Sequence, residues 1–309
     1  MAFSIGKTGP RGTIGLDLGG DHVSAVALER GRVTRVVSQD LPAGLMSDGE
    51  VTDPVALGKA LGDFVSDNDL PRDVRLGVAN QQVAVRPLEL PPIGPGPERD
   101  AAVRFLAADA IAMPLDEAVF DYQIMSEGPG PDGSPRMKVV VVAARQSMVS
   151  TVAEAARIAG LRPLGIDLNA FALVRMLAAP ATDSSAVVYC HVGDVVNLAI
   201  AVGTNCNFTR VLTPVTSPDG SVSGNALGED IRLSIDFFMV QGAGGQVDRV
   251  VLAGPGASRP GLADEVREVV GIDTVVAAPF GSLDASSVAE DESGARYTVA
   301  AGLALGESS

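Results

Sequence analysis

The sequence predicts an α/β protein made of two related halves that face a common cleft. Two segments, Thr13 to Val36 and Ala186 to Val211, share one plan: an apolar strand, a Gly-centred turn, a second apolar strand, a polar turn and a third strand. The turns align on Gly19 and Gly193. Because glycine lets a backbone turn approach an anion and present its N–H groups, such a pair of turns is typical of a phosphate-binding cleft.

Composition agrees with a well-packed protein and excludes two classes of partner. The chain has 309 residues, of which 46% are hydrophobic and 20% charged, enough for two or more packed domains. Its net charge of −15 argues against nucleic acid and anionic lipid. No run is apolar enough to insert into a membrane, and Met1 to Lys7 has no apolar signal region, so we expect a cytoplasmic protein.

Periodicity then places the remaining elements. Helical spacing or short β-branched runs predict a helix at 54–67, strands at 74–78 and 83–90, a helix at 98–111, strands at 118–125 and 137–144, and helices at 146–159, 166–177 and 228–240. A buried strand at 250–253 runs into Gly254-Pro255-Gly256 and a helix at 260–270, and a last helix spans 297–305. The block from 74 to 163 therefore reads as a small insertion of strands and helices that interrupts the first half.

The order of these features carries a family likeness that spans almost the whole chain. The stretches that carry it are Gly15–Gly19, Leu41–Gly44 with Asp48-Gly49, Val85–Pro91, Met113–Glu117 with Phe120–Tyr122, Val139–Arg145, Ala159–Leu161 with Ile166-Asp167, Phe208–Arg210 and Ala301–Ala304. In order and spacing the chain resembles the PilM family of type IV pilus assembly proteins, in the FtsA-like branch of the actin-like ATPase superfamily.

The resemblance implies an actin-like fold, a duplicated RNase H-like core with the small α+β domain that PilM and FtsA share. The first half would comprise 1–73 and 164–180, the inserted domain 74–163, and the second half 181–305, with a small helical subdomain at about 213–245. It also implies a cytoplasmic scaffold at the inner face of the membrane. Such a protein binds the cytoplasmic N-terminal segment of a PilN-like protein in a groove beside the inserted domain, joins the pilus assembly platform, and self-associates as a further interaction.

By the same resemblance, ATP and Mg²⁺ would bind between the two turns. Asp17 matches the residue that holds magnesium through water, and the other nucleotide contacts would be Gly19, Gly20, Asp21, His22, Gly193, Asp194, Glu229, Gly254 and Gly256. The turns also depart from the family pattern. Gly20 offers no hydroxyl, Asp21 brings a negative charge toward an anion, and His191 stands where a second carboxylate is usual. We therefore expect at most a slow ATPase, with no catalytic residue assigned.

Several alternatives remain at this stage. Asp17 and Asp194 are also explained as turn residues that accept local N–H bonds, and His191 as a packed interior residue. A small-molecule kinase of the same fold would need stronger phosphate loops, and an FtsA-like filament protein would end in an amphipathic helix. For the partner segment, the strand Val83–Leu90 is either a pairing edge or an ordinary internal strand, and the acidic excess of the chain could readily supply an acidic groove that suits a basic peptide.

Overall fold

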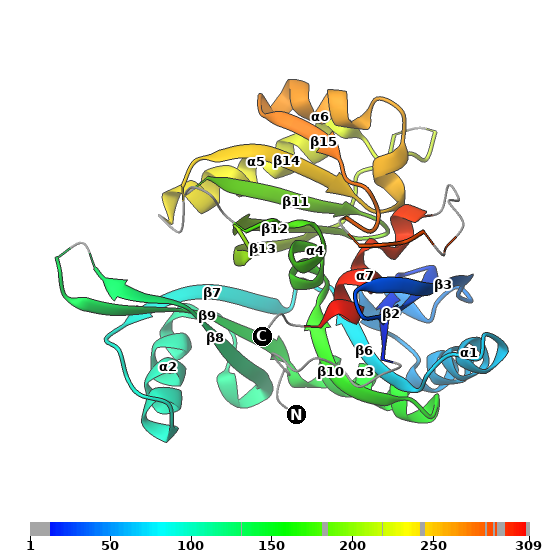
Figure 1. The fold of residues 1–309 in the computed structure, drawn as a ribbon, viewed down its shortest axis with the longest axis horizontal. Helices are drawn as coiled ribbons and strands as arrows, with labels where there is room; N and C mark the ends of the chain where they lie inside the picture. Colours follow the sequence, from blue (N-terminus) through cyan, green and yellow to red (C-terminus); the bar gives the residue numbers. More distant parts are fainter. Residues whose placement is uncertain are drawn as a thin grey trace.

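Two five-stranded sheets of the same strand order form the two lobes of the molecule (Figure 1). The computed structural model describes residues 13–306, apart from 131, 181–184, 218, 242–244, 282, 287 and 289–293. The first sheet contains β1 (Ile14–Leu18), β2 (His22–Glu29), β3 (Arg32–Asp40), β6 (Asp73–Val78) and β10 (Arg162–Leu168), in the order β3-β2-β1-β6-β10. The second contains β11 (Ala186–Val192), β12 (Val196–Val202), β13 (Asn205–Leu212), β14 (Val247–Ala253) and β15 (Asp273–Val276), in the order β13-β12-β11-β14-β15. The predicted duplication is confirmed.

The two hairpins that open the lobes differ by one residue in their turns. Leu18 pairs with Val23 at the end of the first hairpin, whereas Val192 pairs with Val196 at the end of the second. In both sheets the hairpin strand that follows is antiparallel and the fourth strand is parallel to the first. Each Gly turn consequently follows the central strand of its sheet, at the carboxyl end of that strand.

A pair of helices covers one face of each sheet. The helix α1 (Pro54–Asp67) packs on α3 (Gln146–Ile158) in the first lobe, and α5 (Gly224–Val240) packs on α6 (Leu262–Val270) in the second. Asp53 caps α1 by accepting the N–H groups of Val55 and Ala56, and Pro54 fills its first position. Leu57, Leu61 and Phe64 form its buried stripe. Ile231 and Phe238 of α5 belong to the hydrophobic core of the second sheet.

Two further helices join the lobes. The helix α4 (Asn169–Leu177) follows the first sheet but packs on β11 and β12 of the second, while α7 (Thr298–Leu305) follows the second sheet but packs on β1 and β2 of the first. They contact each other between the sheets (Figure 1). The predicted helix at 166–177 is wrong in its first turn, since Ile166 and Leu168 pair with β6 as part of β10. No breaker separates that strand from α4 in the sequence.

The inserted domain is smaller than the block 74–163. It consists of β7 (Val83–Leu90), β8 (Ala118–Pro129) and β9 (Pro135–Arg145), in the order β7-β9-β8, with α2 (Pro97–Ala110) against them. Strand β6 pairs with β1, and α3 packs on α1, so both belong to the first lobe. The short elements are β4 (Met46–Ser47), β5 (Glu50–Val51), η1 (Leu115–Glu117), η2 (Pro255–Ser258) and η3 (Gly294–Tyr297). No helix in the described ranges combines the length and apolar character needed to cross a bilayer.

Candidate functional site

The two Gly turns line one small cavity between the lobes. Its volume is about 200 Å³, and its walls also include the β4–β5 turn and the start of α4. The residues that line it are Asp17, Leu18, Gly19, Gly20, His22, Met46, Ser47, Asp48, Gly49, Ala79, Asn169, His191, Gly193, Asp194, Val195 and Asn197. The structure thus brings together most of the residues that the sequence assigned to a nucleotide site. Asp21, Glu229, Gly254 and Gly256 are not among its lining residues.

Asp17 is the buried acid of the first turn. It stands near the end of β1 with 3% of its surface exposed, and Asn169 of α4 donates its Nδ2–H to Asp17 Oδ1 at 3.0 Å. Burial, the largest influence, raises the pKa of Asp17 to about 6, although the charge of His22 and the Asn169 hydrogen bond act in the opposite direction. The Oδ1 atom of Asn169 is itself buried without a hydrogen-bond partner.

His22 and Asp21 fold back over the first turn. The Nδ1 atom of His22 lies 2.6 Å from Asp21 Oδ1, and a Cβ added at Gly19 would lie 2.5 Å from Cε1 of the His22 ring. The ring therefore packs against Gly19, where only glycine leaves room for it. Burial raises the pKa of Asp21, but hydrogen bonds with His22 and Asp194 outweigh it and hold that pKa below its usual value.

Asp194 crosses from the second turn to the first. The backbone N–H of Asp21 donates to Asp194 Oδ2 at 2.8 Å, and a Cβ at Gly20 would lie 2.7 Å from that same oxygen. Glycine at position 20 is thus needed for the carboxylate of the other lobe to approach. Partial burial, followed by the charge of Asp21, raises the pKa of Asp194. One N–H group of the first turn is satisfied by a carboxylate of the chain.

His191 lies behind the second turn, opposite Asp17 in the duplicated plan. Only 6% of its surface is exposed, and neither ring nitrogen has a hydrogen-bond partner. Burial, together with a smaller effect of the charge of His22, lowers the pKa of His191 to about 4, so the ring is neutral at pH 7. Gly254, at φ +87°, lies against this ring, because a Cβ there would come within 2.8 Å of His191 Nε2.

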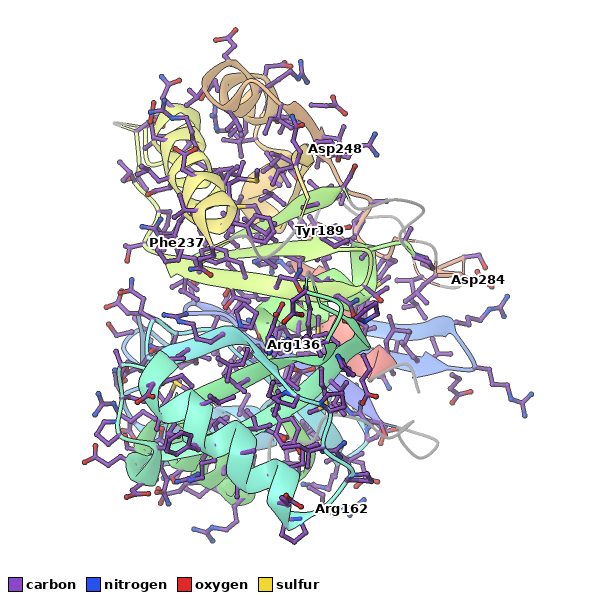
Figure 2. All side chains as sticks on the ribbon, turned by 90° about the vertical axis from the view of Figure 1, so that its left-hand side faces the viewer. Arg136, Arg162, Tyr189, Phe237, Asp248 and Asp284 are labelled. Carbon is purple, nitrogen blue, oxygen red and sulfur yellow. The ribbon has the colours of Figure 1, made fainter. Side chains whose placement is uncertain are left out.

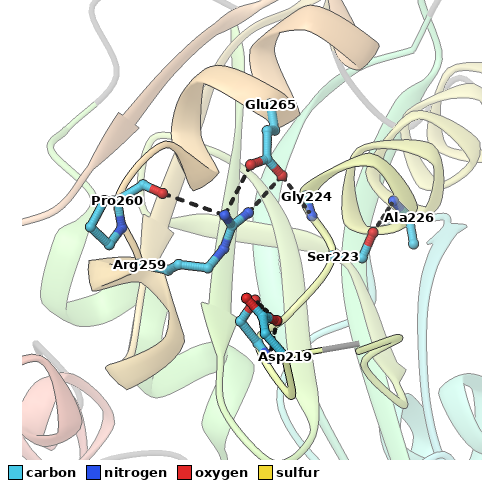
Figure 3. Close-up of polar contacts among 8 residues, drawn as sticks. Asp219, Ser223, Gly224, Ala226, Arg259, Pro260 and Glu265 are labelled. Carbon is cyan, nitrogen blue, oxygen red and sulfur yellow. Dashed lines mark hydrogen bonds and ion pairs between the residues drawn. The ribbon is translucent and has the colours of Figure 1, made fainter. Parts of the chain in front are cut away.

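The segment after β14 supports the second turn from behind. Gly256 packs against Val192, where a Cβ would lie 2.6 Å from Cγ1. Arg259 donates from Nη1 and Nη2 to the Glu265 carboxylate at 2.9 and 2.6 Å, and the N–H of Gly224 at the start of α5 donates to the same carboxylate at 3.1 Å (Figure 3). This ion pair fixes η2 to α6 and α5. Glu229, by contrast, is exposed on α5, where it pairs with Arg232.

The ionisable groups around the cavity favour a cation over a bare phosphate. Asp17, Asp48 and Asp194 supply carboxylates and His22 and His191 imidazoles, whereas no Lys or Arg stands among the described residues that line it. A triphosphate would meet the Asp194 carboxylate at Gly20 and the His22 ring at Gly19. The residues as arranged therefore do not fit a nucleotide triphosphate, although buried Asp17 provides the kind of oxygen ligand that magnesium takes.

A larger groove lies beside the inserted domain. It has a volume of about 550 Å³, and β7, β13 and α5 form its walls. Phe208 and Phe237 face each other there with ring centroids 5.8 Å apart, and Leu233 and Phe237 are each about half exposed, at 53% and 51%. Figure 2 views this side, with Phe237 on the second lobe and the inserted domain below it. Ala79 and Asn197 line both the groove and the cavity.

This groove is basic. Its ionisable lining residues in the described chain are Arg86 and Arg210, with no Asp or Glu. Arg86 donates to the carbonyl of Val85, and Arg210 donates to Ser234 Oγ at 3.2 Å. The acidic excess of the chain therefore lies outside this groove, because net charge describes the whole surface and not any one face.

Sequence reasoning also missed two residues of the cavity. Asn169 and Asn197 are buried, at 5% and 2% exposure, and both line it. Asn197 is the strand partner of His191 and Asn169 contacts Asp17. A buried Asn inside an apolar run is the signal that could have found them, because an amide is buried only with partners or for a role.

Two five-stranded sheets with the same strand order, joined by helices that cross between the lobes around a central cleft, define a protein of the actin-like ATPase fold. The chain belongs to the family of the type IV pilus assembly protein PilM, whose model matches residues 15–212 and 204–308. A chain of a structure titled "PilM-PilN type IV pilus biogenesis complex" is similar to it at 24% identity and a TM-score of 0.78, over 96% of this chain and 98% of that one.

More distant structures share the fold alone. The ethanolamine utilization protein EutJ from Carboxydothermus hydrogenoformans is 12% identical over 95% of this chain and 89% of its own, with a TM-score of 0.50. A Bacteroides thetaiotaomicron protein with an actin-like ATPase fold and unknown function is 10% identical over 88% of this chain and 93% of its own, with the same TM-score. The predicted fold class and family are therefore confirmed.

Proposed function

We propose that this protein is an actin-like scaffold of type IV pilus assembly that binds the cytoplasmic N-terminal segment of a PilN-like inner-membrane protein. Membership of the PilM family supports the pilus role, and the similar structure titled as a PilM-PilN complex supports the partner. The observation that carries the proposal is the groove beside the inserted domain, whose walls combine exposed apolar side chains with two guanidinium groups.

The groove defines the chemistry of the segment it takes. Phe208, Phe237 and Leu233 offer apolar surface, so the segment contributes apolar side chains at this point. Arg86 and Arg210 face the same space and favour a carboxylate on the segment. Strand β7 is an edge of the inserted sheet, so an extended segment can also pair with its backbone, except at Pro87, which lacks an N–H.

Binding of a synthetic peptide of the partner's cytoplasmic segment, followed by fluorescence anisotropy, tests this proposal. Phe237→Ala removes an exposed aromatic wall of the groove and should weaken binding about tenfold or more, as expected for an aromatic anchor. Phe105→Ala is the matched control, because Phe105 is 72% exposed on α2 and does not line the groove. Equal affinities for the two variants would contradict the proposed site.

The same proposal gives the protein a location. A scaffold that lacks a spanning helix in its described part and holds the cytoplasmic segment of an inner-membrane protein would lie in the cytoplasm, at the inner face of the membrane. Its attachment there would depend on the partner and on the rest of the assembly platform.

We further propose that ATP with Mg²⁺ enters the cavity between the turns only after the Asp194 side chain leaves Gly20. In that arrangement Asp17 would hold the magnesium ion through water, and the ion would compensate the charge of the phosphates. The actin-like fold supports this proposal. The Asp194 contact with Asp21 opposes it in the present arrangement, so we expect weak binding and at most slow hydrolysis.

A further inference from the structure

The two histidines of the chain and three of its aspartates come together around the cavity between the lobes. Folding places Asp21, His22 and Asp194 so that one ligand atom from each lies within 4.8 Å of the others. We propose that these three side chains bind a divalent transition-metal ion, such as Zn²⁺, that bridges the two lobes.

The present contacts are close to those of a metal site. His22 Nδ1 and Asp21 Oδ1 are 2.6 Å apart, and Asp194 Oδ2 accepts the Asp21 N–H at 2.8 Å. Ligand bonds of about 2.0 Å in a tetrahedral zinc site leave ligand atoms roughly 3.3 Å apart. The three ligand atoms, which lie within 4.8 Å of one another, must shift to reach this spacing, and the side chains of Asp21 and Asp194 lie at the surface, where they can move.

One unpartnered polar side chain at the same cavity is an independent sign of a bound group. His191 lines the cavity and is 94% buried, and neither of its ring nitrogens is hydrogen-bonded. Its Nε2 atom lies against Gly254, whereas its Nδ1 atom lies near Gly193, which also lines the cavity. Water held by a metal ion in the cavity would supply the hydrogen bond that Nδ1 lacks.

The charges around the cavity favour a cation, and the types of ligand favour a transition-metal ion. Carboxylates surround the cavity without an ammonium or guanidinium group among its described lining residues. One imidazole with two carboxylates suits zinc, manganese or cobalt, whereas magnesium and calcium prefer oxygen alone. These ligands do not include Asp17, the residue proposed to hold magnesium. A metal bound to both turns would tie the lobes together, because Asp21 and His22 belong to the first and Asp194 to the second.

The test uses chelator-treated full-length protein titrated with CoCl₂ by visible absorption and with ZnCl₂ by calorimetry. We expect one ion per chain, an imidazole-containing cobalt spectrum, and affinity reduced tenfold or more in both His22→Asn and Asp194→Asn. Asp48→Asn is the control, because Asp48 lines the same cavity outside the cluster and asparagine tolerates its φ of +50°.

Two results would overturn the metal site: no binding by the wild-type protein, or binding that Asp194→Asn leaves unchanged. Asp194 is exposed, so its amide variant should fold even if the buried His22 variant does not. The proposed function is tested separately, since the partner peptide should bind the Asp194→Asn variant through the groove whether or not a metal binds.

Discussion

Replacing Asp17 by asparagine should stabilise the protein at neutral pH and not in acid. The side chain is 3% exposed, and burial raises its pKa from 3.8 to about 6. Asparagine retains an oxygen that can accept the Asn169 hydrogen bond, but it carries no charge to bury. The variant therefore removes the cost of burying the carboxylate and little else.

The sign and size of the effect follow from the two pKa values. Below about pH 4 the carboxyl group is largely protonated in both the folded and unfolded states, so its burial costs little. Above pH 6 it is ionised in both states, and a pKa difference of about 2 corresponds to roughly 3 kcal/mol against folding. Asp17→Asn should accordingly raise the free energy of unfolding by about 3 kcal/mol at pH 7.5 and by less than about 1 kcal/mol at pH 4.

Urea unfolding of wild type and variant at the two pH values, with EDTA present to remove cations, measures this difference. In a thermal melt, at about 2 °C per kcal/mol for a chain of this size, the midpoint temperature should rise by roughly 6 °C at pH 7.5. Asp48→Asn, an exposed acid of the same cavity, should change stability little at either pH. The reasoning fails if Asp17→Asn is destabilising at pH 7.5, or if its effect is the same at both values.

Two further predictions concern the second turn. His191→Gln should make the free energy of unfolding less sensitive to acid. Folding lowers the pKa of the buried imidazole from 6.5 to about 4, so protonation of the unfolded state lowers the free energy of unfolding of the wild type by about 3 kcal/mol between pH 7.5 and pH 4. The variant lacks the imidazole and should not show this loss. Urea unfolding of the wild type and the variant over a series of pH values measures this difference. Curves of unfolding free energy against pH with the same slope for both proteins would contradict the prediction. Asp194→Ser should tighten Mg²⁺-ATP binding about tenfold, because it takes a carboxylate away from Gly20. Calorimetric titration checks this, and unchanged or weaker binding would count against the proposed nucleotide position.

Much of the fold was predictable because its signals are local. The Gly turns with flanking apolar strands revealed the duplication, and the helix at Gly224–Val240 was predicted, although from Gly228 and so one turn shorter than in the structure. Strand β10 was not, because the apolar run from Ile166 to Leu177 reads equally well as one helix. Only pairing of Ile166 and Leu168 with β6, far back in the sequence, decides between the two.

The candidate site was predictable in its location but not in its contacts. The duplicated turns indicated that Asp17 and Asp194 would face one cleft, and both line the same cavity. That Asp194 reaches the N–H of Asp21 depends on how the two lobes close, across 173 residues of sequence. The same closure gathers His22 with two carboxylates and leaves Glu229 on the outer helix, and no spacing rule contains that information.

Photochemical cross-linking of the partner segment tests the central claim most directly. p-Benzoylphenylalanine would replace either Phe237 in the groove or Phe105 on α2, both of which are exposed. The proposed function predicts that a synthetic peptide of the PilN-like cytoplasmic segment cross-links to the protein substituted at position 237 and not to that substituted at position 105. Cross-linking at position 105 alone, or at neither position although the peptide binds, would contradict it.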